Sequence, residues 1–353
     1  MPRPAVVLLT TGGTVSTEID ATTARSRPSL DAASLASLVR RRDIEVRAME
    51  VARRASWELD PLDMLRIATA ARDAAGDPTV SGVVVTHGTT TMEYTAFLTD
   101  LLLEGDRPVV FTGAMHRSDD PRPDGPGNLR DAIRVAAWPE ASGLGCLVVF
   151  SGRIMAASSV WKARRAGTDA FVDLAGDVGA VSTRTIRMLR RPERLPAFTA
   201  VLAPEVVLVK AVPGAGGHLI DAALQAPVRG LVVEALPGAG GIPPGMRPAL
   251  VAAARQVPVV IASRAPYGSL PPEPTGGTGE PLHGSRILSA GRFTAEQAFV
   301  LLMIILGAHA DAEAAREAYK KAVATASSGS WPTAEDPARV PHGRSAEQDV
   351  EPA

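Results

Sequence analysis

Residues 82–93 read Gly-Val-Val-Val-Thr-His-Gly-Thr-Thr-Thr-Met-Glu, an apolar β-branched run that ends in a polar string and passes directly into a helix-forming segment. The run at 82–85 is typical of a buried strand, and residues 92–103 have the period of a helix. A strand joined to a helix by a short polar turn is the building unit of parallel sheets. The stretch therefore predicts an α/β fold whose polar residues gather where strands end, the usual ligand-binding edge.

The same rhythm of strand and helix continues along most of the chain. In the first half it predicts further strands at 6–9, 108–111 and 146–150 and further helices at 60–75 and 128–137. In the second half it predicts strands at 206–209, 230–234 and 257–262 and helices at 245–255 and 294–306. Because 353 residues exceed what one hydrophobic core usually supports, we expect two domains.

Composition suggests where these parts begin and end. The segment 184–205 is rich in Arg and Pro and is predicted to be a linker, which assigns the N-terminal domain to 1–183 and the C-terminal domain to 206–326. From 327 to 353 the chain is rich in Ser, Pro and charged residues and has almost no apolar ones. This composition predicts a disordered tail without a chemical role.

Charge and cysteine content disfavour several classes of protein. The formal net charge is −1 and the arginines are scattered, so nucleic-acid binding is not expected. The only cysteine, Cys146, excludes an internal disulfide, fits a reducing compartment and lies in an apolar run typical of the core. The longest apolar run, 298–308, is about half of a membrane span, and the N-terminal run is too short for a signal peptide. We therefore expect a cytoplasmic protein without membrane or nucleic-acid partners.

The first polar turn is Thr10-Thr11-Gly12-Gly13-Thr14, directly after the first predicted strand. Its glycines allow a tight turn that leaves N–H groups for a ligand, and Thr14 offers a hydroxyl beside them. Such turns also bind phosphates, but the three-glycine dinucleotide pattern and the P-loop lysine are both missing. By itself, the Gly-Gly pair favours a purely structural turn.

The second polar turn is the string at 86–91. Its hydroxyls fit simple capping of the helix that follows, and His87 fits a turn histidine bonded to the backbone. A third position is Lys162, within Trp161-Lys162-Ala163-Arg164-Arg165, and a lone lysine is normally a solvated surface charge. Each signal is modest, so the indication of a site comes from their occurrence together.

Taken together, these segments resemble the bacterial L-asparaginase and glutaminase family. Residues 11–15 are similar to its first signature, T-G-G-T-I, and residues 86–93 to its second, T-H-G-T-D-T-M-E. The similarity continues between about residues 5 and 310, in order and at family-like spacing, through the segments 113–115, 124–129, 162–169 and 263–268. Because several separate segments match the family in the same order, chance does not explain the similarity.

The resemblance implies two α/β domains: a larger N-terminal one with a parallel, flavodoxin-like sheet that carries the chemistry, and a smaller C-terminal one that closes on it. It also implies a homodimer or homotetramer with sites at subunit contacts, and neither a metal nor an organic cofactor. The implied substrate is a small-molecule side-chain amide, L-asparagine or a related compound, which is hydrolysed to the acid and ammonia.

The resemblance further implies a role for each matching residue. Thr14 attacks the amide carbon to give an acyl-enzyme, Thr89 and Lys162 handle the proton beside it, and Ser56 helps to hold the substrate α-carboxylate. These roles suit the residue types, because a threonine hydroxyl needs a neighbouring base to take its proton. Lys162 can act as that base if its pKa is lowered or if the proton passes through Thr89.

Several positions around the expected substrate depart from the family pattern. Thr90 stands where the family has an aspartate that receives the substrate α-ammonium, and a hydrogen bond to a charged group is worth about 1.5 to 3 kcal/mol. Trp57 stands where many members have a glutamine that touches the substrate. Backbone N–H groups at the two strand ends, around Gly13 and Gly88, are expected to stabilise the oxyanion and need no particular side chain.

The lid and the contribution from a neighbouring subunit are less regular. The stretch at about 16–30 lacks the tyrosine that usually assists the nucleophile, and its candidate substitutes are Thr22, Thr23 and Ser26. The acidic residue that reaches across the subunit contact is either Glu280 or Glu273.

Because the departures surround the substrate while the reacting residues are retained, the sequence favours an active hydrolase with an altered amide preference. Its substrate would lack a free α-amine or carry a bulkier group. The competing interpretation is a catalytically weak or inactive ligand-binding protein on the same fold. A third interpretation, a subunit that supplies ammonia to a transferase, would require an added domain or partner surface, and the sequence shows neither.

Overall fold

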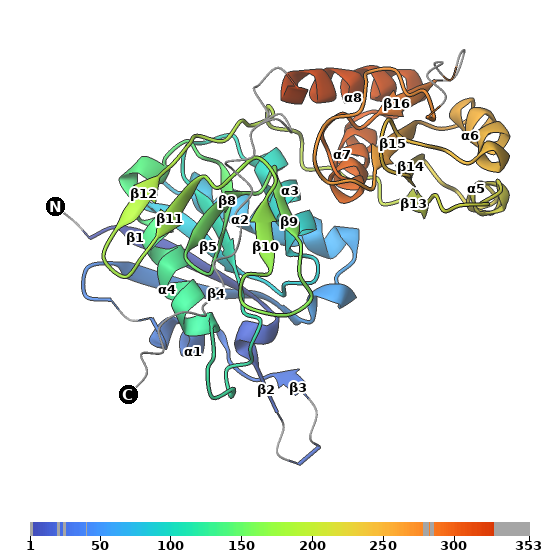
Figure 1. Cartoon of the computed structure of the whole chain (residues 1–353). Helices are drawn as coiled ribbons and strands as arrows, with labels where there is room; N and C mark the ends of the chain where they lie inside the picture. Colours follow the sequence, from blue (N-terminus) through green and yellow to red (C-terminus); the bar gives the residue numbers. More distant parts are fainter. Residues whose placement is uncertain are drawn as a thin grey trace, which may run out of the picture.

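The computed structural model describes residues 3–19, 22–23, 26–39, 41–277, 282 and 286–327. The predicted tail lies outside the described residues from position 328 onward. Figure 1 shows two α/β parts, each with a sheet covered by helices, which follow one another along the chain. The larger sheet has eight strands and the smaller one has four.

The larger sheet runs in the order β12-β11-β8-β7-β6-β5-β1-β4. Its parallel part consists of β4 (Glu45–Arg54), β1 (Ala5–Gly12), β5 (Gly82–Thr86), β6 (Val109–Thr112) and β7 (Cys146–Phe150). Taken in chain order, these strands are arranged 2-1-3-4-5, which is the flavodoxin-like order. The predicted fold class is therefore confirmed, and the apolar runs at 6–9, 82–85, 108–111 and 146–150 are its central strands.

Three short antiparallel strands extend this sheet: β8 (Arg153–Ala156), β11 (Gly179–Val181) and β12 (Ile186–Met188). The last of them lies inside the segment 184–205, which was predicted to be a linker, so that prediction is wrong for the first part of the segment. An edge strand buries little and tolerates polar residues, which is why its Arg-rich composition hid it. Beyond it, the chain crosses to the second sheet without regular secondary structure until position 206.

Helices cover both faces of the larger sheet. One face carries α1 (Ala32–Ser37) and α4 (Gly125–Ala136), and the other carries α2 (Pro61–Gly76) and α3 (Met92–Leu102). The predicted helices at 60–75, 92–103 and 128–137 are confirmed, with α4 starting three residues early, at Gly125. Cys146 is 1 % exposed, as its apolar surroundings predicted. The edge strand β4 and the short helix α1 were not predicted.

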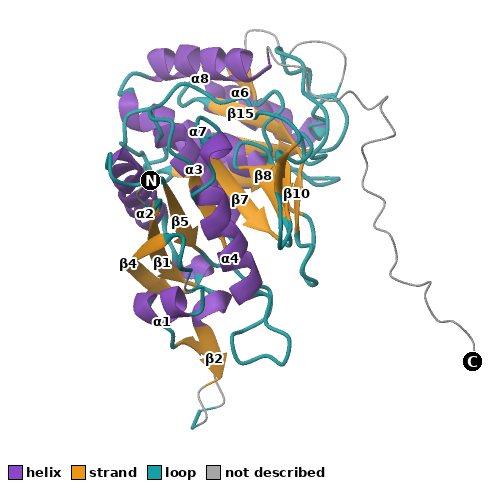
Figure 2. Ribbon diagram, turned by 90° about the vertical axis from the view of Figure 1, so that its left-hand side faces the viewer, coloured by secondary structure: helices purple, strands orange, loops and turns teal. Residues whose placement is uncertain are grey.

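The smaller sheet is parallel, in the order β13 (Val206–Lys210), β14 (Gly230–Ala235), β15 (Val259–Ser263) and β16 (Ile287–Ser289). Its helices are α5 (His218–Ala223), α6 (Arg247–Ala254), α7 (Ala295–Ala308) and α8 (Ala312–Ser327). Two small hairpins complete the fold: β2 (Thr17–Ile19) with β3 (Ser26–Pro28), and β9 (Val160–Lys162) with β10 (Phe171–Asp173). Figure 2 shows β2 at the end of the molecule opposite α8.

The two parts share one apolar core. Phe97 and Leu98 of α3 belong to the same buried cluster as Leu302 of α7, and the rings of Phe97 and Phe293 lie 5.7 Å apart. Burial of α7 on nearly all sides explains the long apolar run at 298–308. None of the helices in the described ranges is both long and apolar enough to cross a bilayer.

Candidate active site

The turns that follow β1 and β5 meet at one edge of the larger sheet. Thr10 of β1 lies opposite Thr86 of β5, so the two polar turns leave neighbouring parallel strands side by side. The hydroxyl of Thr11 donates to the carbonyl of Thr86 at 2.8 Å and ties the turns together. Strand order reverses here, since β4 lies on one side of β1 and β5 on the other. Such a switch point is where open α/β sheets bind ligands.

Close backbone contact joins these turns to a third one, after β4. Gly13 has a φ of 82°, and a Cβ at this position would lie 2.6 Å from both the N and the Cα of Gly88. A Cβ at Gly88 would in turn lie 2.6 Å from the hydroxyl oxygen of Ser56. The two glycines are therefore required by contact as well as conformation, and they bring Thr14, Ser56 and Thr89 to the same edge of the sheet.

Replacing Gly13 by alanine should destabilise the fold by about 3 kcal/mol, because strain at positive φ adds to a clash with backbone atoms that cannot move aside. The matched control is Gly214→Ala, since Gly214 has a φ of 78° but nothing within 4 Å of an added Cβ. That control should cost about 1 to 2 kcal/mol, from backbone strain alone. Urea unfolding of both variants checks the difference, and equal losses would mean that the turns do not pack as described.

The hydroxyls of Thr14 and Ser56 both lack a hydrogen-bond partner within the described part of the chain. Thr14 opens the short 3-10 helix η1 (Thr14–Ser16), is partly exposed, and its hydroxyl makes no hydrogen bond within the described part of the chain. Ser56 is only 2 % exposed, yet its hydroxyl has no hydrogen-bond partner among the described residues. Leaving a buried hydroxyl unpaired costs about 1 to 3 kcal/mol, so a bound polar group here would recover that energy.

Two other predicted positions lie at the rim of this region. Trp57 is 71 % exposed although it follows the buried Ser56, and Thr90 is exposed although it follows the buried Thr89. In each pair a buried residue is followed by an exposed one, so the Trp57 indole and the Thr90 hydroxyl both remain accessible at the surface of this chain. At position 90 the site presents a neutral side chain.

The two residues that were expected to handle the proton, Thr89 and Lys162, are in direct contact. The Nζ of Lys162 donates to the hydroxyl of Thr89 at 2.7 Å, although the two residues are 73 positions apart in the chain. The backbone N–H of Lys162 donates to the carboxylate of Glu93 at 2.6 Å. Nζ also lies 6.0 Å from the centre of the Phe171 ring, which is opposite Lys162 in the β9–β10 hairpin.

Burial shifts both ionisable groups of this contact. It lowers the pKa of Lys162, whereas the charge of Glu93 acts in the opposite direction. Burial raises the pKa of Glu93 to about 7, against the hydrogen bond from the Lys162 N–H. Both shifts favour the neutral form of the group, and a lysine whose pKa is lowered is more easily used as a general base.

Glu93 is the last residue of the stretch 86–93 that resembles the second family signature, but no role was expected for it. Only four of the 37 basic residues are lysines, at 162, 210, 320 and 321, and the last three are exposed. A lysine can lose its proton whereas an arginine stays charged, so the sequence drew attention to Lys162 but gave no signal for Glu93.

His87 is fully buried, with Nδ1 2.8 Å from the carbonyl of Gly88, and burial lowers its pKa to about 4. The folded protein therefore binds this proton less well than the unfolded chain, so stability is complete above pH 6.5 and falls as pH drops towards 4. We expect a loss of about 3 kcal/mol over that window. His87→Asn keeps a hydrogen-bond donor for the Gly88 carbonyl but has no group that titrates. Urea unfolding of this variant at several pH values should therefore no longer show this loss of stability.

The raised pKa of Glu93 makes the folded protein more stable as pH falls over part of the same range, which opposes the effect of His87. Because Glu93 is present in both proteins, the difference between the wild type and His87→Asn reports the contribution of His87 alone. An unaltered pH slope in His87→Asn would show that this histidine is not buried as a neutral group.

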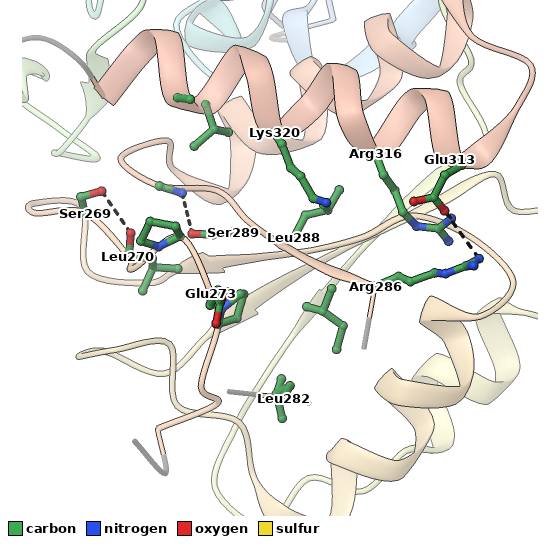
Figure 3. Close-up of a pocket in the computed structure, with 16 residues that line it drawn as sticks. Ser269, Leu270, Glu273, Leu282, Arg286, Leu288, Ser289, Glu313, Arg316 and Lys320 are labelled. Carbon is green, nitrogen blue, oxygen red and sulfur yellow. Dashed lines mark hydrogen bonds and ion pairs between the residues drawn. The ribbon is translucent and has the colours of Figure 1, made fainter. Parts of the chain in front are cut away.

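The remaining predicted residues divide into those that the structure describes and those that it does not. Glu280 lies outside the described residues, and Glu273 lines a separate cavity of about 880 Å³ between α8 and β16. Figure 3 shows Lys320 of this cavity's wall pointing from α8 towards β16. In the lid, Thr22 and Thr23 are exposed, and the side chain of Ser26 lies outside the described part. The large cavity is therefore distinct from the edge that carries Thr14.

Comparison with known proteins agrees with this architecture. The family model described as "Asparaginase, N-terminal" matches residues 5–194, and the one described as "Glutaminase/Asparaginase C-terminal domain" matches residues 205–319. The chain belongs to the asparaginase family, and it is an enzyme of the amidohydrolase class.

Similar proteins cover nearly the whole chain. A probable L-asparaginase of Deinococcus radiodurans is 34 % identical over 331 residues, which are 91 % of this chain and 98 % of the relative. An L-asparaginase of Thermococcus kodakarensis is 30 % identical over 338 residues, which are 92 % of this chain and 99 % of the relative. The crystal structure of a probable cytoplasmic L-asparaginase from Campylobacter jejuni, 26 % identical, superposes with a TM-score of 0.78 and covers 91 % of this chain and all of its own.

Proposed function

We propose that this protein hydrolyses a side-chain amide, L-asparagine or a related compound, to the acid and ammonia through an acyl-enzyme on Thr14. The observation that carries the proposal is the 2.7 Å hydrogen bond from Lys162 to Thr89 at the sheet edge where the Gly13-Thr14 turn packs against Gly88. A lysine held against a threonine hydroxyl can accept a proton through it, which is what a threonine nucleophile requires.

In the proposed reaction, the Thr14 hydroxyl oxygen attacks the amide carbon while its proton passes to the Thr89–Lys162 pair. The same pair returns a proton to the leaving nitrogen, so ammonia departs and an ester to Thr14 remains. Water then attacks the ester, which releases the acid and restores the Thr14 hydroxyl. Backbone N–H groups of the turns at Gly13 and Gly88 stabilise the oxyanion in both steps.

The surroundings of this site favour an amide without a free α-amine or with a bulkier group. Thr90 is neutral and exposed, so it supplies no carboxylate to a substrate ammonium, whereas the unpaired hydroxyl of Ser56 suits a carboxylate. The exposed Trp57 adds an apolar surface beside it. A cytoplasmic location and assembly into a homodimer or homotetramer, with Glu280 supplied across the contact, belong to the same proposal.

The test is ammonia release from L-asparagine, D-asparagine, L-glutamine and asparagine derivatives with a blocked α-amine. We expect release from at least one amide, with kcat/KM for a blocked-amine derivative above that for L-asparagine. Ordinary efficiency with plain L-asparagine would contradict the altered preference. No release from any amide, together with binding seen as a thermal shift, would instead support a ligand-binding protein on this fold.

A further inference from the structure

Glu93 holds the segment that carries Lys162. The lysine lies on β9, which pairs with β10 in a two-stranded hairpin outside the main sheet. Its backbone N–H donates a hydrogen bond of 2.6 Å to the carboxylate of Glu93, which lies in the first turn of α3. Because α3 packs against the main sheet and begins directly after the Thr89 turn, this side chain ties the lysine backbone to the helix that follows that turn.

Glu93 also supplies a negative charge that acts on the Lys162 ammonium. Position 90, where the family pattern has an aspartate, is the neutral Thr90 here. The charged and titratable groups that act on Glu93 are Lys162 from β9 and Glu296 from the start of α7, and Glu93 in turn acts on its neighbour Tyr94. The like charge of Glu296 and burial both oppose ionisation of Glu93, and Lys162 favours it.

We propose that Glu93 is a positioning residue of the Lys162–Thr89 pair, fixing the backbone of the lysine and providing the carboxylate charge that position 90 does not. The inference rests on the proposed function, because it assigns Lys162 to proton transfer. Glu93 does not touch the substrate in this proposal. It acts through the lysine, and its effect therefore depends on pH.

The sign of this dependence follows from the charges. An ionised Glu93 stabilises the ammonium form of Lys162, so removing the charge makes the lysine lose its proton at lower pH. The pKa of Glu93 itself, about 7, means that its charge changes within the working range of an enzyme at neutral pH. Glu93→Gln keeps an oxygen for the Lys162 N–H and removes only the charge, whereas Glu93→Ala removes both.

The first measurement is kcat and KM against pH for the wild type and both variants. In Glu93→Gln the acidic limb of kcat/KM should move to lower pH by about half to one unit. In Glu93→Ala the maximal kcat should fall by about 10- to 100-fold with little change in KM, because the lysine loses its placement. The control is Glu317→Gln, whose carboxylate pairs with Lys320 on the surface, and it should match the wild type.

The second measurement does not require turnover. With four lysines in the chain, 13Cε-lysine labelling gives few signals, and that of Lys162 is assigned with Lys162→Arg. Glu93→Gln should lower the titration midpoint of Lys162 by about half to one pH unit and leave the other three unchanged. Glu317→Gln, which removes a carboxylate from α8, should leave the Lys162 midpoint unchanged.

A Lys162 midpoint that does not move in Glu93→Gln, or a wild-type kcat in Glu93→Ala, would overturn the positioning role. These outcomes remain distinct from failure of the proposed function. If the wild type released ammonia from none of the amides while Glu93→Gln still shifted the Lys162 midpoint, the electrostatic contact would stand and the hydrolase would not. Thermal melts of each variant show whether it is folded.

Discussion

Thr14→Ala is expected to lower ammonia release from the best amide by about 10³-fold or more, with the fold intact. The reason is that Thr14 presents the one hydroxyl that ends the Gly-Gly turn at the sheet edge, and alanine cannot form the acyl bond. The affinity for the amide should change little, since the hydroxyl contributes to bond formation more than to binding. Steady-state kinetics and a thermal shift with the substrate separate these two effects.

Thr14→Ser and Thr10→Val are the controls for this result. The serine keeps a nucleophilic hydroxyl and should retain measurable turnover. Thr10→Val removes a hydroxyl from the same strand, one that is 3 % exposed at the residue level and has no hydrogen-bond partner in the described part of the chain. It should therefore leave both activity and stability at least at the wild-type level. Turnover by Thr14→Ala comparable to that of the wild type would exclude the threonine acyl-enzyme.

Lys162→Arg is expected to lower kcat by about 10²- to 10⁴-fold, the range for loss of a positioned acid–base group. Arginine keeps the positive charge but cannot lose its proton, so it can bond the Thr89 hydroxyl without accepting from it. The matched control is Lys210→Arg, a surface lysine paired with Glu234 at 2.8 Å, which should behave like the wild type. A kcat for Lys162→Arg within a few-fold of normal would show that Lys162 acts only through its charge.

The parallel core of the fold was predictable from the sequence because its signals are strong and local. Buried strands such as the one at 82–85 are continuous apolar runs, and the helix that begins at Met92 follows its turn at once. The turns of the candidate site were predictable for the same reason, since the ends of parallel strands such as β1 and β5 share one edge. What the sequence could not give was the contact between Lys162 and Thr89, which depends on how a hairpin outside the sheet folds back.

Several of the elements that were missed have weak or misleading composition, although the Ala-rich helix α8 was also not predicted. Strand β4 is an edge strand rich in charge, with Arg53 paired to Glu50, and such a pattern resembles a loop. Strand β12 was hidden by arginines, and the short helix α1 is too brief to show a period. Glu93 was missed as a contact because a helix-start glutamate is ordinarily explained by the helix dipole alone.

The apolar core shared by α3 and α7 has a consequence for how substrate reaches Thr14. Swinging the two domains apart would expose Phe97, Phe293 and Leu302 to water, and each fully exposed side chain of this size costs about 1.5 to 3 kcal/mol. A hinge motion that separates the two domains is therefore energetically unfavourable. We therefore expect entry to and exit from the site to depend on the segments that border it within the larger domain, such as the β2–β3 hairpin, while the two sheets keep their mutual orientation.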